Sequence, residues 1–179
     1  MEETKKPAQK IILKNMHIPY NTDRWTPRNF RGLERINPKT GKVVNREGER
    51  NFCIFLPTDQ VDPEQMIEDG WNISKTENPT DAQAEPSYML RVKVRWHPEG
   101  SDFVRLNPKI KIVTNNSRMM MDEENVGDLD NMQIVKANMT INATWKVTPS
   151  YTGYVAYLSD MVARIFEDEG TLEELEEGI

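Results

Sequence analysis

The chain has 179 residues, which suits one domain, and its hydrophobic fraction of 37% is enough for a modest core. Its single cysteine, Cys53, excludes an intrachain disulfide, and no apolar run approaches the ~18 residues that a membrane span needs. The N-terminal residues lack the apolar stretch of a signal peptide, so we expect a cytoplasmic protein that does not associate with membranes.

The formal net charge of −6 conceals an asymmetry along the chain. Residues 1–60 carry a formal charge of +5, whereas residues 161–179 carry −6. A basic front and an acidic end are typical of proteins that bind nucleic acid or that use a tail to contact partners. We therefore expect a flexible N-terminus over 1–9, a folded domain over 10–166 and an acidic tail over 167–179.

The first third of the chain predicts strands separated by polar turns. Residues 11–19 have strand character, and residues 20–50 are rich in Arg, Asn, Pro and Gly. Within that segment, NPKTG at 37–41 predicts a turn, and residues 42–45 can form the return arm of a hairpin. Residues 51–57 are apolar on both sides and predict a mostly buried strand, in which Cys53 is a small buried residue.

One short helix is expected over residues 59–70. Asp62 can cap its start, Pro63 suits the first helical position, and Gly70 can end it. The following Trp71 is expected to pack in the core. Residues 77–87 hold two prolines and no apolar residue larger than alanine, so they predict a loop.

The strand at residues 88–96, YMLRVKVRW, alternates cleanly between apolar and basic residues. Because successive side chains of a strand point to opposite faces, Tyr88 and Trp96 are expected on the core side. Arg91, Lys93 and Arg95 lie on the other side and form a row of cations.

A second strand is expected at residues 103–114, with a turn at 97–102, so we predict an antiparallel pair with 88–96. Lys109 and Lys111 alternate with isoleucines in this strand. An antiparallel pair would gather all five cations on one face. Like charges directly opposite one another destabilise a sheet unless a ligand neutralises them. The alternative is an ordinary solvated face.

The last third contains two further candidate strands. Residues 119–132 are acidic and predict a short helix or an irregular connection, and residues 133–147 alternate, with Lys146 on the polar side. Residues 153–166 fit either a helix or a strand with a break at Ser159, and periodicity alone leaves both open. In the strand alternative the apolar face holds Val155, Tyr157, Met161 and Ile165.

These elements predict a mainly β fold with one short helix and long loops. The specific expectation is a five-stranded OB-fold-like barrel followed by the acidic C-terminal tail.

No arrangement of residues indicates catalysis. Two histidines and one cysteine cannot form a His/Cys zinc site, and no phosphate-binding glycine loop is present. We therefore expect a protein that is not an enzyme and needs no cofactor or metal. The acidic residues between Asp122 and Asp130 leave a small metal-dependent nuclease as a remote alternative, against the simpler interpretation of a solvated loop.

The segment RWTPRNFRGLER at residues 24–35 places aromatic residues among arginines. Arg24, Arg28 and Arg31 can grip phosphates, and Trp25 and Phe30 can stack on bases without regard to their identity. This combination is typical of sequence-tolerant single-strand binders. The alternative is that the two aromatic rings plug one end of the barrel and the arginines are solvated.

The last 13 residues, EDEGTLEELEEGI at 167–179, carry seven carboxylates. A tail of this kind can occupy a basic groove or recruit a basic partner. The alternative is a solubilising extension.

The order of motifs resembles a family of phage-encoded single-stranded DNA-binding proteins. The resemblance rests on NREGERNFCIFLP, DGWNI, YMLRVKVRW, NVGDLDNMQIVKANMTI and GYVAYLSDMVARIFEDE, within roughly residues 10–170. It implies an OB-fold core, single-stranded DNA binding during replication or recombination in the host cytoplasm, and a tail that contacts replication proteins. It also implies a strand over 153–166. The chain ends in Gly178-Ile179, whereas many single-strand binders end in an aromatic residue, so the tail's partner stays open.

We therefore predict a sequence-independent single-stranded DNA binder. The predicted contacts are Arg24, Trp25, Arg28, Phe30, Arg31, Arg91, Lys93, Arg95, Lys109, Lys111 and Lys146. The rival hypothesis is a viral structural or assembly β-domain that binds protein partners, which the net acidity and the run Met119–Met121 favour. The sequence leaves a homodimer and the choice between DNA and RNA open.

Overall fold

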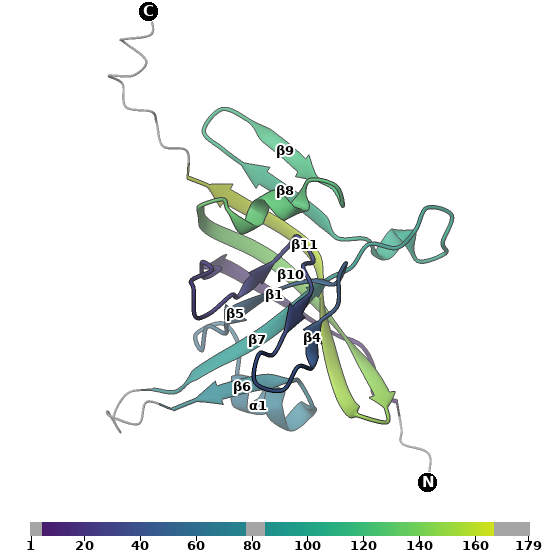
Figure 1. The fold of residues 1–179 in the computed structure, drawn as a ribbon. Helices are drawn as coiled ribbons and strands as arrows, with labels where there is room; N and C mark the ends of the chain where they lie inside the picture. The colour runs from purple at the N-terminus through teal and green to yellow at the C-terminus, as the bar shows by residue number, and fades with distance from the viewer. Residues whose placement is uncertain (1–4, 78–84, 167–179) are drawn as a thin grey trace, which may run out of the picture.

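The computed structural model describes residues 5–77 and 85–166. These residues form eleven strands, one α-helix and two short 3₁₀-helices (Figure 1). The strands are β1 (Gln9–Met16), β2 (Arg28–Asn29), β3 (Arg35–Ile36), β4 (Val43–Asn45), β5 (Arg50–Phe55), β6 (Ile73–Thr76), β7 (Ser87–Val94), β8 (Lys109–Val113), β9 (Arg118–Met121), β10 (Ile134–Thr148) and β11 (Tyr151–Ile165). The helices are α1 (Pro63–Asp69), η1 (Val104–Leu106) and η2 (Val126–Asp130).

Nine of the described strands form the main sheet, and β3 and β4 pair separately. The two longest strands, β10 and β11, form an antiparallel hairpin, and β1 pairs with the outer edge of β10. Both β7 and β8 pair with the other edge of β11. The path continues from β7 to β5 and β2, while β6 joins at β7 and β9 joins at β8.

The main sheet is not closed into a barrel. Among the described strands, β1 pairs only with β10 and β2 pairs only with β5, so the two ends of the path do not meet. The predicted five-stranded OB-fold-like barrel is therefore wrong, whereas a mainly β fold with one short helix is confirmed. The physical reason is that β8 continues along the edge of β11 beyond β7 and extends the sheet toward β9.

The expected antiparallel pair of residues 88–96 and 103–114 does not form. Both β7 and β8 run parallel to β11, where Lys93 lies opposite Tyr157 and Lys109 lies opposite Asp160. Residues 95–108 connect β7 to β8 without reversing the direction of the chain. As a result β7 pairs with β11 at Tyr157, and β8 pairs with the later residues 160–164. The cations of β7 and β8 therefore follow one another along β11, which avoids the like-charge pairing expected across an antiparallel ladder.

The helix and the first hairpin form as their sequences predict. The Asp62 side chain accepts a hydrogen bond from the backbone N–H of Gln65 at 3.2 Å, and Pro63 opens α1. Gly70 ends the helix at φ 108°, a left-handed conformation that glycine adopts without strain. The 37–41 turn connects β3 to β4, which pair antiparallel.

Residues 153–166 belong to a strand that contains a bulge. The register between β10 and β11 shifts opposite Thr140 and Ile141, at the position of Ser159. The break at Ser159 was expected, but the residues before it turn the opposite face to the core from the one predicted. Tyr154, Ala156 and Leu158 are buried, so Tyr157 lies on the opposite face from the core.

The core side chains lie on the inner face of the sheet. The apolar residues of β7 are buried as predicted, with Tyr88 at 8% exposure, and Trp96 is half-buried beyond the end of the strand. Trp71 is buried, and its indole N–H donates to Gln9 Oε1 at 2.9 Å. Cys53 is buried as expected, and burial raises the pKa of its thiol.

Candidate nucleic-acid interface

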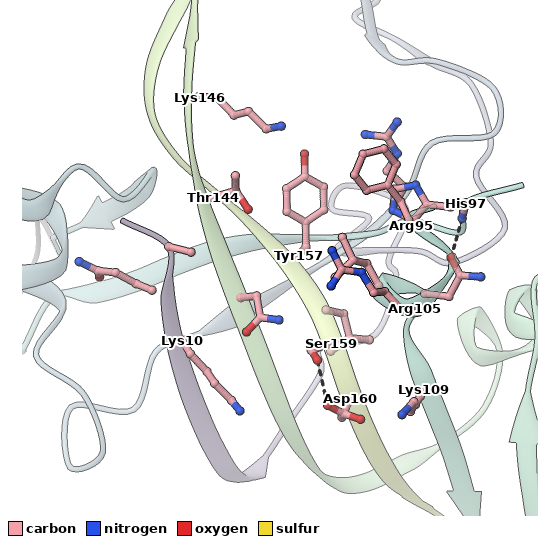
Figure 2. Close-up of a pocket in the computed structure, with 17 residues that line it drawn as sticks. Lys10, Arg95, His97, Arg105, Lys109, Thr144, Lys146, Tyr157, Ser159 and Asp160 are labelled. Carbon is pink, nitrogen blue, oxygen red and sulfur yellow. Dashed lines mark hydrogen bonds between the residues drawn. The ribbon is translucent and has the colours of Figure 1, made fainter. Parts of the chain in front are cut away.

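A groove of about 750 Å³ lies on the outer face of the sheet (Figure 2). Its lining comes from β1, β10, β11, β8 and the 95–108 connection. Asn142 and Thr144 belong to it, and they alternate with the buried Ile141 and Ala143 of β10. The groove therefore lies on the side of the sheet opposite the core. Its charged residues are Lys10, Arg95, Arg105, Lys109, Lys146 and Asp160.

A second groove of about 520 Å³ adjoins the first and lies over β4, β5 and β7. Arg95 and Tyr157 line both hollows, so the two lie side by side, and we call them together the basic groove. The second part adds Arg50, Arg91, Lys93, Glu49 and Glu123. Together the lining holds eight Lys or Arg and three Asp or Glu, in a chain whose formal net charge is −6. A depression lined by one sign of charge concentrates ligands of the opposite sign.

Strand alternation places the cations of β7 in the basic groove. Val92 and Val94 are buried, so the intervening Lys93 and its neighbours Arg91 and Arg95 are exposed on the outer face. The β8 residue Lys109 follows them along the edge of β11. The row of cations thus runs along the edge of β11 and faces the groove.

Tyr157 lies at the junction of the two parts of the basic groove. It pairs in register with Asn142 of β10 on one side and with Lys93 of β7 on the other. Figure 2 shows its ring rising from the floor of the groove, with Thr144 and Lys146 drawn on the neighbouring strand. A half-exposed phenol ring in this position offers both a π face and a hydroxyl to a ligand.

The connection between β7 and β8 adds a second aromatic group to the groove. Phe103 is 55% exposed, and its ring packs against the His97 imidazole with centroids 5.8 Å apart. The backbone N–H of His97 donates to Asn107 Oδ1 at 2.6 Å, which ties the two ends of the connection together. Both rings line the groove beside Arg95 and Arg105.

Arg50 is partly neutralised where it borders the second part of the groove. Its guanidinium lies 3.5 Å from Glu123 Oε1 and stacks over the Trp96 ring at 5.8 Å. The Arg50 side chain is half-buried, and it also donates to the Glu123 backbone carbonyl at 3.3 Å. Arg50 is therefore anchored at the border of the groove, and Glu123 offsets part of its charge.

The carboxylates of the proposed nuclease alternative make structural contacts. Asp122 Oδ1 accepts hydrogen bonds from two backbone N–H groups in its own turn, and buried Asp130 accepts one from Phe30 at 2.7 Å. Within residues 5–77 and 85–166, no three His, Cys, Asp or Glu side chains gather as a metal site would require. No helix in the same ranges is long and apolar enough to span a membrane.

The sequence matches the profile of a family described as "Putative phage ssDNA-binding domain" over residues 6–176. The chain belongs to this phage ssDNA-binding domain family. The resemblance inferred from the order of motifs is thereby confirmed.

Curated proteins and solved structures provide less information about this phage ssDNA-binding domain. No curated protein sequence matches it. Among solved structures, the single-stranded DNA-binding protein from bacteriophage Enc34 in complex with ssDNA is similar, with a TM-score of 0.45 and 9% sequence identity. The match covers 89% of this chain and 88% of that one. At this level of similarity no contact is transferred from that complex to this chain.

Five of the eleven residues predicted to contact DNA line the basic groove of this phage ssDNA-binding domain: Arg91, Lys93, Arg95, Lys109 and Lys146. Lys111 lies two residues beyond Lys109 on the same face of β8, outside the groove. Arg24, Trp25 and Arg31 are exposed but line neither part of it. The Trp25 ring leans against Phe55, with centroids 5.7 Å apart.

The prediction that Arg28 holds a phosphate does not fit its position. Its side chain is fully buried and donates to four backbone carbonyls, those of Ile18 (2.6 Å), Met132 (2.7 Å), Pro19 (3.0 Å) and Leu129 (3.1 Å). Burial lowers the pKa of Arg28, while Tyr20 and Asp130 oppose this effect. Arg28 therefore holds the 18–19 segment against the end of η2, where no ligand can reach it.

Phe30 is likewise in the core and not at the surface. It is fully buried, and its ring stacks on Phe52 with centroids 5.1 Å apart. The alternative interpretation, in which this ring packs inside the fold, is the one that its position supports. A fully buried ring cannot stack on a nucleobase.

Five groove residues were not among the contacts predicted from the sequence: Lys10, Arg50, Phe103, Arg105 and Tyr157. Phe103 and Arg105 lie in a connection that was assigned to a strand, which hid their exposure. Tyr157 was assigned to the apolar face of its strand. A search for aromatic residues adjacent to cations in the 97–108 segment would have found Phe103.

Proposed function

We propose that this chain binds single-stranded DNA without sequence preference and that the strand lies along the basic groove. The observation that carries this proposal is the concentration of eight cations in two adjacent hollows on one face of an acidic protein. Phosphate contacts of this kind supply most of the affinity of non-specific nucleic-acid binding. Membership of the phage ssDNA-binding family supports the same ligand.

The aromatic side chains favour a single strand over a duplex as the ligand. Phe103 and Tyr157 stand within the groove among the cations Arg95, Arg105 and Lys109. Stacking on such rings requires unpaired bases, whose π faces a duplex hides. Stacking and phosphate contacts carry little sequence information, so the binding is sequence-independent.

Membership of the phage ssDNA-binding family also suggests a biological role for this binding. The protein would protect or organise single strands during phage DNA replication or recombination in the host cytoplasm, with no chemical step. The acidic tail, 167–179, lies outside the described residues. Its seven carboxylates suit a role in modulating DNA binding or recruiting replication proteins.

A double substitution in the groove tests the proposal. Arg95→Ala with Lys109→Ala removes two groove cations, and Lys39→Ala with Lys42→Ala removes two exposed cations outside the groove. Binding to labelled oligo-dT is measured by fluorescence anisotropy at several salt concentrations. The groove variant should bind more weakly, and its log–log salt slope should be shallower by about 1.4, since each phosphate contact contributes about 0.7 for single strands.

The control variant should keep the slope of the unmodified protein. Equal losses in both variants would assign the binding to overall charge and reject the groove as the site. Absence of binding in the unmodified protein would favour the rival function, a viral structural or assembly domain that binds proteins. The exposed side chains of Met119 and Met120 are the observation that supports this rival.

A further inference from the structure

The main sheet ends at an open edge on β9. Among the described strands, β9 pairs with β8 and with no other. Figure 1 shows it on the outer side of the β8–β9 hairpin. An open edge presents unpaired N–H and C=O groups, which can pair with a strand from another chain.

On two other outer strands a side-chain amide caps the backbone of one residue. On β1, the Gln60 amide accepts from the Lys14 N–H at 2.8 Å and donates to the Lys14 carbonyl at 2.7 Å. On β2, the Asn21 amide bonds the N–H and carbonyl of Arg28 in the same way. Each cap occupies the backbone groups that an added strand would need at that residue. Residues 118–121 have no such cap from any described side chain and contain no proline.

The hairpin geometry identifies the backbone groups that face outward. The N–H of Thr114 donates to the Ser117 carbonyl at 2.9 Å, which closes the turn. Hydrogen-bonded and non-bonded pairs alternate along an antiparallel ladder. In the observed register, Met119 and Met121 therefore bond to β8, and Arg118 and Met120 direct their backbone groups to the open edge.

We propose that β9 pairs antiparallel with β9 of a second copy of this chain and so extends the sheet across a two-fold axis. The sequence from Arg118 to Asp122, RMMMD, is complementary to itself in this arrangement. With the axis at Met120, Met119 would lie opposite Met121 of the second copy, and the backbone bonds across the axis would join the two copies of Met120. The Asp122 N–H already donates to Asn125 Oδ1 at 2.7 Å, so the Arg118 side chain would meet the Asp122 carboxylate of the second copy beyond the end of the backbone pairing. Opposite charges on neighbouring strands attract each other, and this charge pair would occur twice in an isologous contact.

The side chains around the edge also suit a partner. Met119 and Met120 are 44% and 53% exposed, whereas Met121 is buried. Met120, Lys111 and Val162 lie in register across β9, β8 and β11, and Val162 is also exposed. Met120 of the second copy would extend this row, and flexible methionine side chains adapt readily to such contacts.

A cysteine substitution in the full chain tests the register. The two copies of residue 120 would face each other as a hydrogen-bonded pair with Cα atoms about 5.5 Å apart, which suits a disulfide. Met120→Cys should therefore form a covalent dimer under mild oxidation without DNA. Met119→Cys is the matched control, because its two copies would lie diagonally about 7–8 Å apart. The native Cys53 is buried and does not compete.

Sedimentation velocity over a range of protein concentrations gives a second readout. The unmodified chain should dimerise, Met120→Ala should still dimerise, and Met120→Pro should be monomeric because it removes only an outward N–H. A monomeric unmodified chain at every concentration would overturn the proposal. Equal crosslinking of Met119→Cys and Met120→Cys would do the same. Because no DNA is present, these outcomes are independent of the proposed DNA binding.

Discussion

Lys93 of β7 lies opposite Tyr157 of β11, at the point where the two parts of the basic groove meet. This parallel pairing brings a cation and an aromatic ring together from segments more than 60 residues apart in sequence. The groove therefore depends on the long-range topology of the sheet. Its cations come from β1, β5, β7, β8, β10 and the 95–108 connection.

Phe103 is expected to contribute stacking energy and no charge. Phe103→Ala should weaken binding to oligo-dT by about 5- to 150-fold, because one base–aromatic stack contributes about 1–3 kcal/mol. The salt slope should not change, because no phosphate contact is lost. Anisotropy at several salt concentrations measures both quantities.

Leu106→Ala is the matched control for Phe103. Leu106 also lines the groove and is 52% exposed, but it has no π face. A loss of affinity in Leu106→Ala as large as that in Phe103→Ala would show that Phe103 contributes apolar area alone.

Arg28 is expected to stabilise the fold and to leave DNA binding unaffected. Arg28→Met leaves four buried carbonyls without their charged donor, so the free energy of unfolding should fall by about 3 kcal/mol or more. Urea unfolding checks this value. The exposed Arg24→Ala should change it by less than about 0.5 kcal/mol.

The decrease in the free energy of unfolding at acidic pH should depend on Glu64. Lys75 Nζ at 2.6 Å and the Tyr88 hydroxyl at 2.7 Å donate to its carboxylate, and these bonds lower the pKa of Glu64 from the ordinary value of 4.5. A lowered pKa in the folded state means that the stabilisation is complete above the unfolded value and is lost as pH falls through the folded value. The free energy of unfolding should therefore fall on acidification.

The variant Glu64→Gln isolates this contribution. Its unfolding free energy in urea should decline less steeply below pH 4.5 than that of the unmodified chain. Identical pH profiles would show that Glu64 is not coupled to folding.

Local patterns in the sequence predicted those elements that depend on nearest neighbours. The alternation in YMLRVKVRW placed Val92 and Val94 in the core and Lys93 outside, as the structure shows. Asp62, Pro63 and Gly70 marked the ends of α1 for the same reason, because capping is decided within a few residues. Five groove cations were found in this way.

The pairing of strands was beyond the reach of such patterns. A turn that contains Pro and Gly after Trp96 is compatible with a hairpin. It is equally compatible with a connection between two strands that both pair with β11, and β11 lies dozens of residues away in the sequence. The bulge at Ser159 reversed the face of Tyr157, since a one-residue shift exchanges the two faces of a strand. The buried Arg28 and the exposed Arg24 look alike in sequence, because only the folded chain brings four carbonyls around one of them.

The central claim is tested most directly by anisotropy with a labelled oligo-dT of about 30 nucleotides, compared with the matching duplex over a salt series. The account predicts micromolar or tighter binding to the single strand that weakens as salt rises, with much weaker binding to the duplex. The same series on a chain truncated after Phe166 excludes a blocking effect of the tail. No single-strand binding by either chain at low salt, or equal binding to the duplex, would contradict the account.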